Sequence, residues 1–184
     1  RGAQVVAFDE NPQASVDLSH AAFALKAGPL APHFFEGFSL VVASPGVPLS
    51  KPELVAARDA DVPLIGEIEL AARLLSPRAG PILGITGTNG KSTTTALLGE
   101  LMQASGRSTF VGGNLGLPFT EACAQVYESH VVELSSFQLE GMHETELLGA
   151  AILNLTPDHL DRYASHEAYG LAKARIFQKQ PSQE

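Results

Sequence analysis

The sequence is poor in cysteine and in basic residues, and it contains no tryptophan. The single cysteine, Cys123, excludes an intrachain disulfide and a zinc cluster built on cysteines. Twelve basic residues against 20 acidic ones give a net charge of −8. No broad basic surface is therefore available for a nucleic-acid backbone or an anionic membrane, and any phosphate must be bound by a local group of donors.

Long apolar runs are absent as well. Stretches such as residues 150–153 fall far short of the roughly 20 residues that span a bilayer, and no signal-like segment is recognisable at the start. The 184 residues, 45% hydrophobic and 17% charged, are typical of a globular protein of one or two domains. We expect a cytoplasmic monomer without membrane or nucleic-acid partners.

Predicted strands and helices alternate along the chain, an order typical of an α/β fold with a parallel sheet. Apolar patterns predict strands at Val5–Phe8, Leu40–Ala43, Ile82–Thr86, Thr109–Val111, His130–Leu134 and Ala150–Leu155. Helical periodicity predicts helices at Pro52–Asp59, Glu67–Leu75, Lys91–Ser105 and Ala168–Phe177.

A Pro- and Gly-rich break at Ser76–Pro81 predicts a boundary between an N-terminal domain, residues 1–76, and a central domain, residues 77–184. We interpret Val5–Phe8 as the second strand of a Rossmann-like nucleotide-binding unit. Its first strand and glycine-rich turn would precede residue 1, because a parallel pair needs a crossover of a dozen or more residues. No strand is expected after Gln178, so we expect an incomplete central domain too.

The strongest motif is a glycine-rich loop that joins the strand Ile82–Thr86 to the next helix. Gly87 and Gly90 permit backbone angles that aim N–H groups at an anion, and the helix N-terminus adds partial positive charge. Lys91 would neutralise the β- and γ-phosphates of a nucleotide, and the Ser92 hydroxyl would reach Mg²⁺. The predicted nucleotide-binding residues are Gly87, Thr88, Asn89, Gly90, Lys91, Ser92 and Thr93.

This loop departs from the general P-loop pattern, because Ile85 stands where glycine is expected six residues before the lysine. With that departure it resembles the ATP-binding loop of the Mur ligases and folylpolyglutamate synthetases. Four further segments resemble the Mur ligases that add D-glutamate. They are Ser-Pro-Gly-Val-Pro at 44–48, Gly-Gly-Asn-Leu-Gly at 112–116, Val-Val-Glu-Leu-Ser-Ser-Phe-Gln-Leu-Glu at 131–140 and Asn-Leu-Thr-Pro-Asp-His-Leu-Asp-Arg at 154–162.

The resemblance implies a truncated Rossmann-like domain that binds the UDP substrate, followed by part of a P-loop Mur-ligase central domain. It further implies an amide-forming reaction of peptidoglycan synthesis. ATP would phosphorylate the carboxylate of UDP-N-acetylmuramoyl-L-alanine, and the amine of D-glutamate would attack the acyl phosphate. Since no amino-acid-binding C-terminal domain follows, we expect the chain alone to be inactive.

Glu133 ends a buried strand at the carboxyl edge of the sheet, where α/β proteins bind ligands and where a carboxylate suits Mg²⁺. The resemblance implies two Mg²⁺ ions held by Ser92, Glu133, His159 and a CO₂-derived carbamate on Lys173. It assigns catalysis to Lys91, Lys173 and His159, and substrate binding to Asn114, Ser135, Ser136 and Gln138.

Each of these residues also has a purely structural interpretation. Serines after a strand are often helix caps, and Asn114 fits a turn that needs unusual backbone angles. From the sequence alone Lys173 is a solvated helix lysine.

Two alternative functions remain open at this stage. One is a regulatory NTPase that uses the same loop as a switch, although no base-recognition motif is visible. The other is a folate-type amino-acid ligase, which the segment Ser135–Gln138 disfavours.

Overall fold

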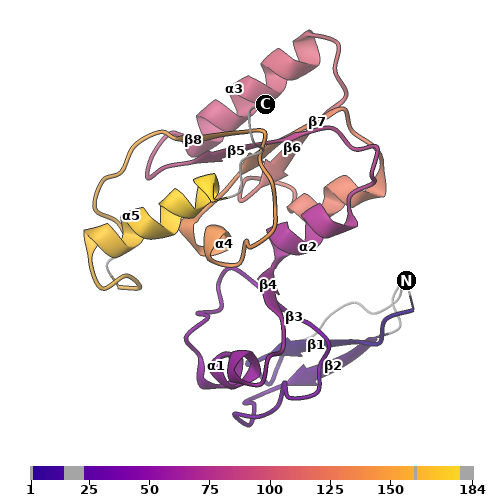
Figure 1. The fold of residues 1–184 in the computed structure, drawn as a ribbon, viewed down its shortest axis with the longest axis vertical. Coiled ribbons are helices and arrows are strands. Elements are labelled where there is room, and N and C mark those ends of the chain that lie inside the picture. The colour runs from indigo at the N-terminus through magenta and orange to yellow at the C-terminus, as the bar shows by residue number, and fades with distance from the viewer. Residues whose placement is uncertain (1, 15–22, 160, 179–184) are drawn as a thin grey trace. The chain divides into compact units, whose positions relative to one another are not determined.

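The computed structural model describes residues 2–14, 23–159 and 161–178 (Figure 1). Contacts divide the chain into two compact units, Arg1–Ser39 with Leu49–Pro63 and Leu40–Pro48 with Leu64–Glu184. This division does not coincide with the break at Ser76–Pro81, so the expected domain limits stay a prediction. The end of the chain after Gln178, where no strand is expected, lies outside the described residues.

The described residues of the first unit form a two-stranded parallel sheet and one helix. β1 (Val5–Asp9) pairs with β2 (Phe23–Ala27), with Val5 opposite Phe23. α1 (Pro52–Asp59) has proline in its first turn, where no backbone N–H is needed. The sequence did not predict β2, since its Phe-Ala-Leu-Lys-Ala is short and contains alanine and lysine, both depleted in strands.

The second unit is built on a four-stranded sheet in the order β6-β7-β5-β8, with every pair parallel. The strands are β5 (Ile82–Thr86), β6 (Thr109–Gly113), β7 (Ser129–Glu133) and β8 (Gly149–Ile152). The expected α/β fold with a parallel sheet is confirmed. A short parallel pair, β3 (Val41–Ala43) and β4 (Leu64–Gly66), belongs to the same unit.

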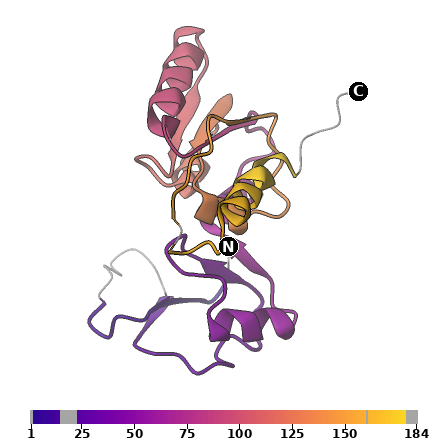
Figure 2. The same cartoon turned by 90° about the vertical axis from the view of Figure 1, so that its left-hand side faces the viewer.

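Helices cover both faces of this sheet. α3 (Lys91–Ala104) lies on one face, and α4 (Ser136–Glu140) and α5 (His166–Ala174) lie on the other (Figures 1 and 2). α2 (Glu67–Leu74) packs against the 3₁₀ helix η1 (Phe119–Ala124), and a second 3₁₀ turn, η2 (Arg175–Phe177), follows α5. The core between them includes Ile68, Phe110, Phe119, Val132, Leu134, Leu139, Leu147 and Ile176.

Most expected elements are found with bounds shifted by one or two residues, and the larger differences lie near the glycine-rich loop. The strand expected at Ala150–Leu155 is shorter, Gly149–Ile152, and the chain after it runs alongside the glycine-rich loop. The last expected helix starts earlier, at His166, where the Ser165 side chain accepts the Ala168 N–H at 3.1 Å. Residues Ser136–Glu140, expected as loop, form a helix.

α2 is tied to the second unit by a buried carboxylate. Glu69, fully buried, accepts backbone N–H groups of His143, Glu144 and Thr145 at 3.0 to 3.2 Å, the Thr145 hydroxyl at 2.7 Å and the Arg73 guanidinium at 2.9 Å. Burial alone would raise the pKa of Glu69, but these hydrogen bonds lower it from 4.5 to about 2. The carboxylate therefore stays ionised and fixes the loop after α4.

Among the described residues, no helix is long and apolar enough to cross a membrane.

Candidate nucleotide and substrate site

The glycine-rich loop follows the carboxyl end of β5, one of the two interior strands of the sheet. Gly87 has φ +153°, and a Cβ there would lie 3.2 Å from Leu153 Cβ and 3.4 Å from the Asn154 nitrogen, so only glycine fits. Gly90, with φ +82°, precedes α3, and no side chain in the described part of the chain caps this helix. The N–H groups of its first turn are therefore available to an anion, as the motif predicts.

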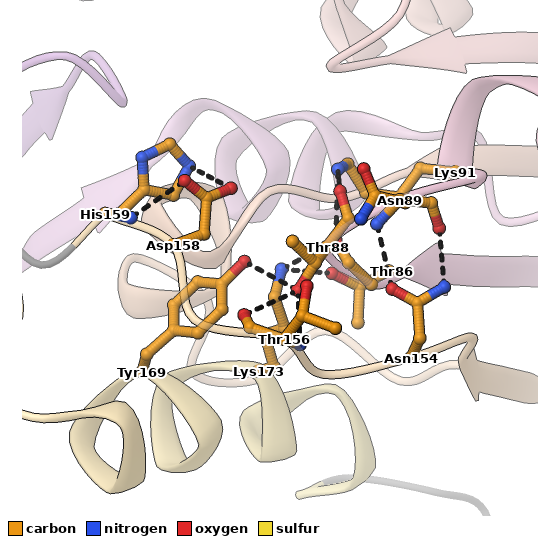
Figure 3. A network of polar contacts seen from close by, with 11 residues as sticks. Thr86, Thr88, Asn89, Lys91, Asn154, Thr156, Asp158, His159, Tyr169 and Lys173 are labelled. Atoms are coloured by element: carbon orange, nitrogen blue, oxygen red, sulfur yellow. Dashed lines mark hydrogen bonds and ion pairs between the residues drawn. The ribbon is translucent and has the colours of Figure 1, made fainter.

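Two lysines reach the carbonyl groups of this loop. Lys91 Nζ donates to Gly87 O at 3.0 Å and to Thr88 O at 2.9 Å. Lys173 Nζ donates to the same Gly87 O at 3.0 Å and contacts Thr86 Oγ1 at 3.4 Å (Figure 3). The structure thus brings together two of the three predicted catalytic residues, although they are 82 positions apart.

Lys173 is not the solvated helix lysine that the sequence alone suggests. Its side chain is 2% exposed, with the Nζ atom 4.7 Å from the centre of the Tyr169 ring. The pKa of Lys173 is lowered from 10.5 to about 8, chiefly by burial and also by the nearby Lys91 ammonium, while Asp158 acts in the opposite direction. At neutral pH a larger fraction of Lys173 is therefore in the uncharged amine form than for an exposed lysine.

Glu133 lies beside the loop, as expected. It is the last residue of β7, opposite Ile85 of β5 and Gly113 of β6. Its side chain is 2% exposed. Oε1 accepts a hydrogen bond from Asn114 Nδ2 at 2.7 Å, and Oε2 has no hydrogen-bond partner among the residues that the structure describes. A buried carboxylate oxygen without a partner is costly, and a cation would stabilise it.

His159 lies on the segment that follows β8, and its backbone is strained. Its φ is +51°, which is uncommon for a residue other than glycine. Its Nε2 lies 3.6 Å from Asp158 Oδ2, and its ring centre is 5.0 Å from that of Phe137. Nearly half of the side chain is exposed, so the imidazole can reach a ligand. Leu160, the next residue of this motif, lies outside the described residues.

Only two of the four predicted metal ligands, Glu133 and His159, are conventional metal-binding side chains. Within the part of the chain that the structure describes, no group of three or more His, Cys, Asp or Glu side chains is placed to hold a metal ion. Metal binding by Ser92, Glu133, His159 and Lys173 therefore stays a prediction. The unpartnered Glu133 oxygen is of the chemical type that a hard cation such as Mg²⁺ prefers.

The three predicted substrate residues after β7 begin a helix instead of lying in a loop. Ser135 Oγ accepts the Gln138 N–H at 3.2 Å and Gln138 Oε1 accepts the Ser135 N–H at 2.9 Å, a capping box. Ser136 and Gln138 are buried, at 2% and 6% exposure. The Ser-x-x-Gln spacing could have predicted this helix, and substrate binding by the three side chains stays a prediction.

The sequence missed several residues that hold the site together. Asn154, Thr156 and Tyr169 contact the glycine-rich loop (Figure 3). Arg162 donates to Pro45 O and to Glu140 Oε2, both at 3.2 Å. The resembling segment 154–162 contains Asn154, Thr156 and Arg162 but gives no role to them, and no signal pointed to Tyr169, because the partners of these residues are distant in sequence.

A phosphate-binding loop at the carboxyl edge of a parallel sheet, with lysines and a carboxylate beside it, defines a nucleotide-binding α/β protein of the P-loop class. Comparison with known proteins is more specific. Residues 85–184 match the Mur ligase middle domain, and residues 1–66 match the N-terminal domain of MurD-like Mur ligases. The chain belongs to the Mur ligase family.

Curated relatives carry one common name. The UDP-N-acetylmuramoylalanine--D-glutamate ligase of Myxococcus xanthus (strain DK1622) is 54% identical over 187 residues, covering 98% of this chain and 41% of the relative. The ligase of the same name from Anaeromyxobacter dehalogenans (strain 2CP-C) is 60% identical over 148 residues, covering 79% of this chain and 31% of the relative. The chain thus spans well under half of these relatives.

A solved structure supports the fold alone. The UDP-N-acetylmuramate:L-alanyl-gamma-D-glutamyl-meso-diaminopimelate ligase from Neisseria meningitides superposes with a TM-score of 0.55 at 16% sequence identity. The match covers 97% of this chain and 61% of that protein.

Proposed function

We propose that this chain forms the nucleotide-binding part of a cytoplasmic, monomeric ligase that adds D-glutamate to UDP-N-acetylmuramoyl-L-alanine at the expense of ATP. The shared name of relatives at 54% and 60% identity supports this substrate pair over a folate. The amide bond would extend the peptide of the peptidoglycan precursor. Because the chain spans 41% of the Myxococcus relative, we expect the 184 residues alone to bind nucleotide without forming the amide.

One observation carries the proposal: a phosphate-binding loop, a buried Lys173 and a buried Glu133 with an unpartnered oxygen meet at one edge of the sheet. In phosphoryl transfer to a carboxylate, the negatively charged carboxylate must approach the negatively charged triphosphate. Catalysis therefore depends on positioning and on positive charge. The uncapped start of α3 and Lys91 would bind the β- and γ-phosphates. The substrate carboxylate would attack the γ-phosphorus, with ADP as the leaving group.

The second half of the reaction needs an uncharged amine. The D-glutamate nitrogen would attack the carbonyl carbon of the acyl phosphate, and inorganic phosphate would leave as the nitrogen loses a proton. In this scheme Asn114, Ser135, Ser136 and Gln138 bind the UDP-sugar substrate. Asn114 is held in place by Glu133, through hydrogen bonds to both its side chain (2.7 Å) and its backbone N–H (2.9 Å).

Mg²⁺ would supply the positive charge that lets the two anions approach. Ser92 and Glu133 would hold one ion, and His159 with a carbamate on Lys173 would hold a second. A carbamate forms only on a neutral amine. With a pKa of about 8, about a quarter of Lys173 would be neutral at pH 7.5, against about one part in a thousand for an ordinary lysine.

The proposal is tested by ADP release in a complete ligase that carries this chain. We expect release that depends on both UDP-N-acetylmuramoyl-L-alanine and D-glutamate, and none with a folate in place of the UDP-sugar. Release with the folate and L-glutamate would contradict the proposed substrate. Amide formation by the 184-residue chain alone would contradict the expectation that it needs further domains.

A further inference from the structure

The pairing of β5 with β8 continues past the ends of both strands. Leu153 donates its N–H to Thr86 O at 2.9 Å, and Thr88 donates its N–H to Asn154 O at 3.1 Å. The segment after β8 therefore runs alongside the phosphate-binding loop instead of turning away from it.

Asn154 extends this pairing with its side chain. Its Oδ1 accepts the Asn89 N–H at 2.9 Å, and its Nδ2 donates to Asn89 O at 2.9 Å (Figure 3). A carboxamide carries one acceptor and two donors in the geometry of a peptide group, so it can hold both polar atoms of one backbone residue. No apolar or purely acidic side chain of this size can make both bonds.

A second pair of contacts joins the same two segments. Thr156 donates its N–H to Thr88 Oγ1 at 3.0 Å, and Thr88 Oγ1 lies 3.2 Å from Thr156 O. Tyr169 of α5 places its hydroxyl 3.4 Å from the same Thr88 oxygen. The loop backbone at residues 88 and 89 is thus fixed just before Gly90 and the open N–H groups of α3.

We propose that Asn154 is a positioning residue for the phosphate-binding loop, and that nucleotide binding at the loop orders the segment that leads to Asp158 and His159. The inference rests on the nucleotide site of the proposed function. Asn154 contacts no phosphate itself in this scheme. It fixes the peptide of Asn89, so that the following N–H groups face the anion, and it joins the loop to the segment four residues before Asp158.

The first test is titration calorimetry of the chain with MgADP. Asn154→Leu keeps the approximate size of the side chain and removes both hydrogen bonds to Asn89, so we expect the dissociation constant to rise about tenfold. Gln103→Leu is the matched control, because it removes another side-chain amide, which donates to Thr109 O at 3.3 Å beside β6. The control should bind MgADP like the parent chain.

A second readout separates positioning from a general loss of stability. Hydrogen–deuterium exchange of the parent chain should show that MgADP protects residues 153–159, and Asn154→Leu should lose this protection while its far-ultraviolet circular dichroism stays unchanged. Should the variant not fold, the parent chain still decides: an absence of protection in this segment on MgADP binding overturns the inference.

The two proposals fail in different ways. A parent chain that does not bind MgADP contradicts the nucleotide site itself. A parent chain that binds, together with an Asn154→Leu variant of equal affinity and equal protection, contradicts the role of Asn154 alone.

Discussion

Replacing Glu69 by glutamine should destabilise the second unit by an amount that depends on pH. The carboxylate has no solvent exposure and accepts hydrogen bonds from the backbone of residues 143–145, which hold its pKa at about 2 instead of 4.5. This difference corresponds to about 3 kcal/mol of stability at neutral pH. Glutamine has the same size as glutamate, but its NH₂ group would face the backbone N–H donors of residues 143–145. Most of this stability should therefore be lost.

The sign of the pH dependence follows from the lowered pKa. In the parent chain the stabilisation is fully present above about pH 4.5 and is lost as the pH falls towards 2, because only the unfolded state takes up the proton in that range. Glu69→Gln has no such group. The difference in stability between the two chains should therefore narrow by roughly half between pH 7 and pH 3.

Urea unfolding followed by circular dichroism at several pH values measures this difference. Glu67→Gln is the matched control on the same helix, since Glu67 accepts a single backbone N–H, from Thr120, at 2.6 Å. We expect the control to cost about 1 kcal/mol. A Glu69→Gln chain as stable as the control at pH 7, or a difference that does not change with pH, would refute the reasoning.

Two further predictions concern Lys173 and His130. In a complete ligase, Lys173→Ala should abolish most activity. A small added carboxylic acid that occupies the position of the carbamate should restore part of it. Activity of the unrescued variant within a factor of a few of the parent would show that Lys173 is not a metal ligand. Burial lowers the pKa of His130, so the unfolded state binds its proton first and stability should fall as the pH drops below about 6.5. Urea unfolding at pH 7.5 and 5.5 should show a smaller loss for His130→Leu than for the parent chain, and equal losses would contradict a buried neutral His130.

The glycine-rich loop could be predicted in detail because its signals are local. The strand Ile82–Thr86 is found at the expected bounds, and α3 ends one residue before the expected Ser105. A buried apolar strand, glycines that permit unusual backbone angles and a following helix all lie within about two dozen residues. Glu133 could be placed for the same reason, since it directly ends an apolar run.

Other features could not be predicted because their partners are far away in sequence. Glu69 resembles a solvent-facing charge on an amphipathic helix, but the backbone N–H groups that it accepts are 74 to 76 residues further on. Lys173 resembles an exposed helix lysine, and only its packing against Tyr169 and the loop buries it. The three-residue strand β4 is too short to show a period.

The central claim, that this chain binds a nucleotide at residues 87–93, is tested most directly by calorimetry with Mg²⁺ and a nonhydrolysable ATP analogue. The parent chain should bind, and Lys91→Ala should weaken binding about 10- to 100-fold, because it removes a charged donor to the phosphates. Arg107→Ala, which removes the same charge near the amino end of β6, should leave binding unchanged. Equal affinity of Lys91→Ala and the parent chain would contradict the account.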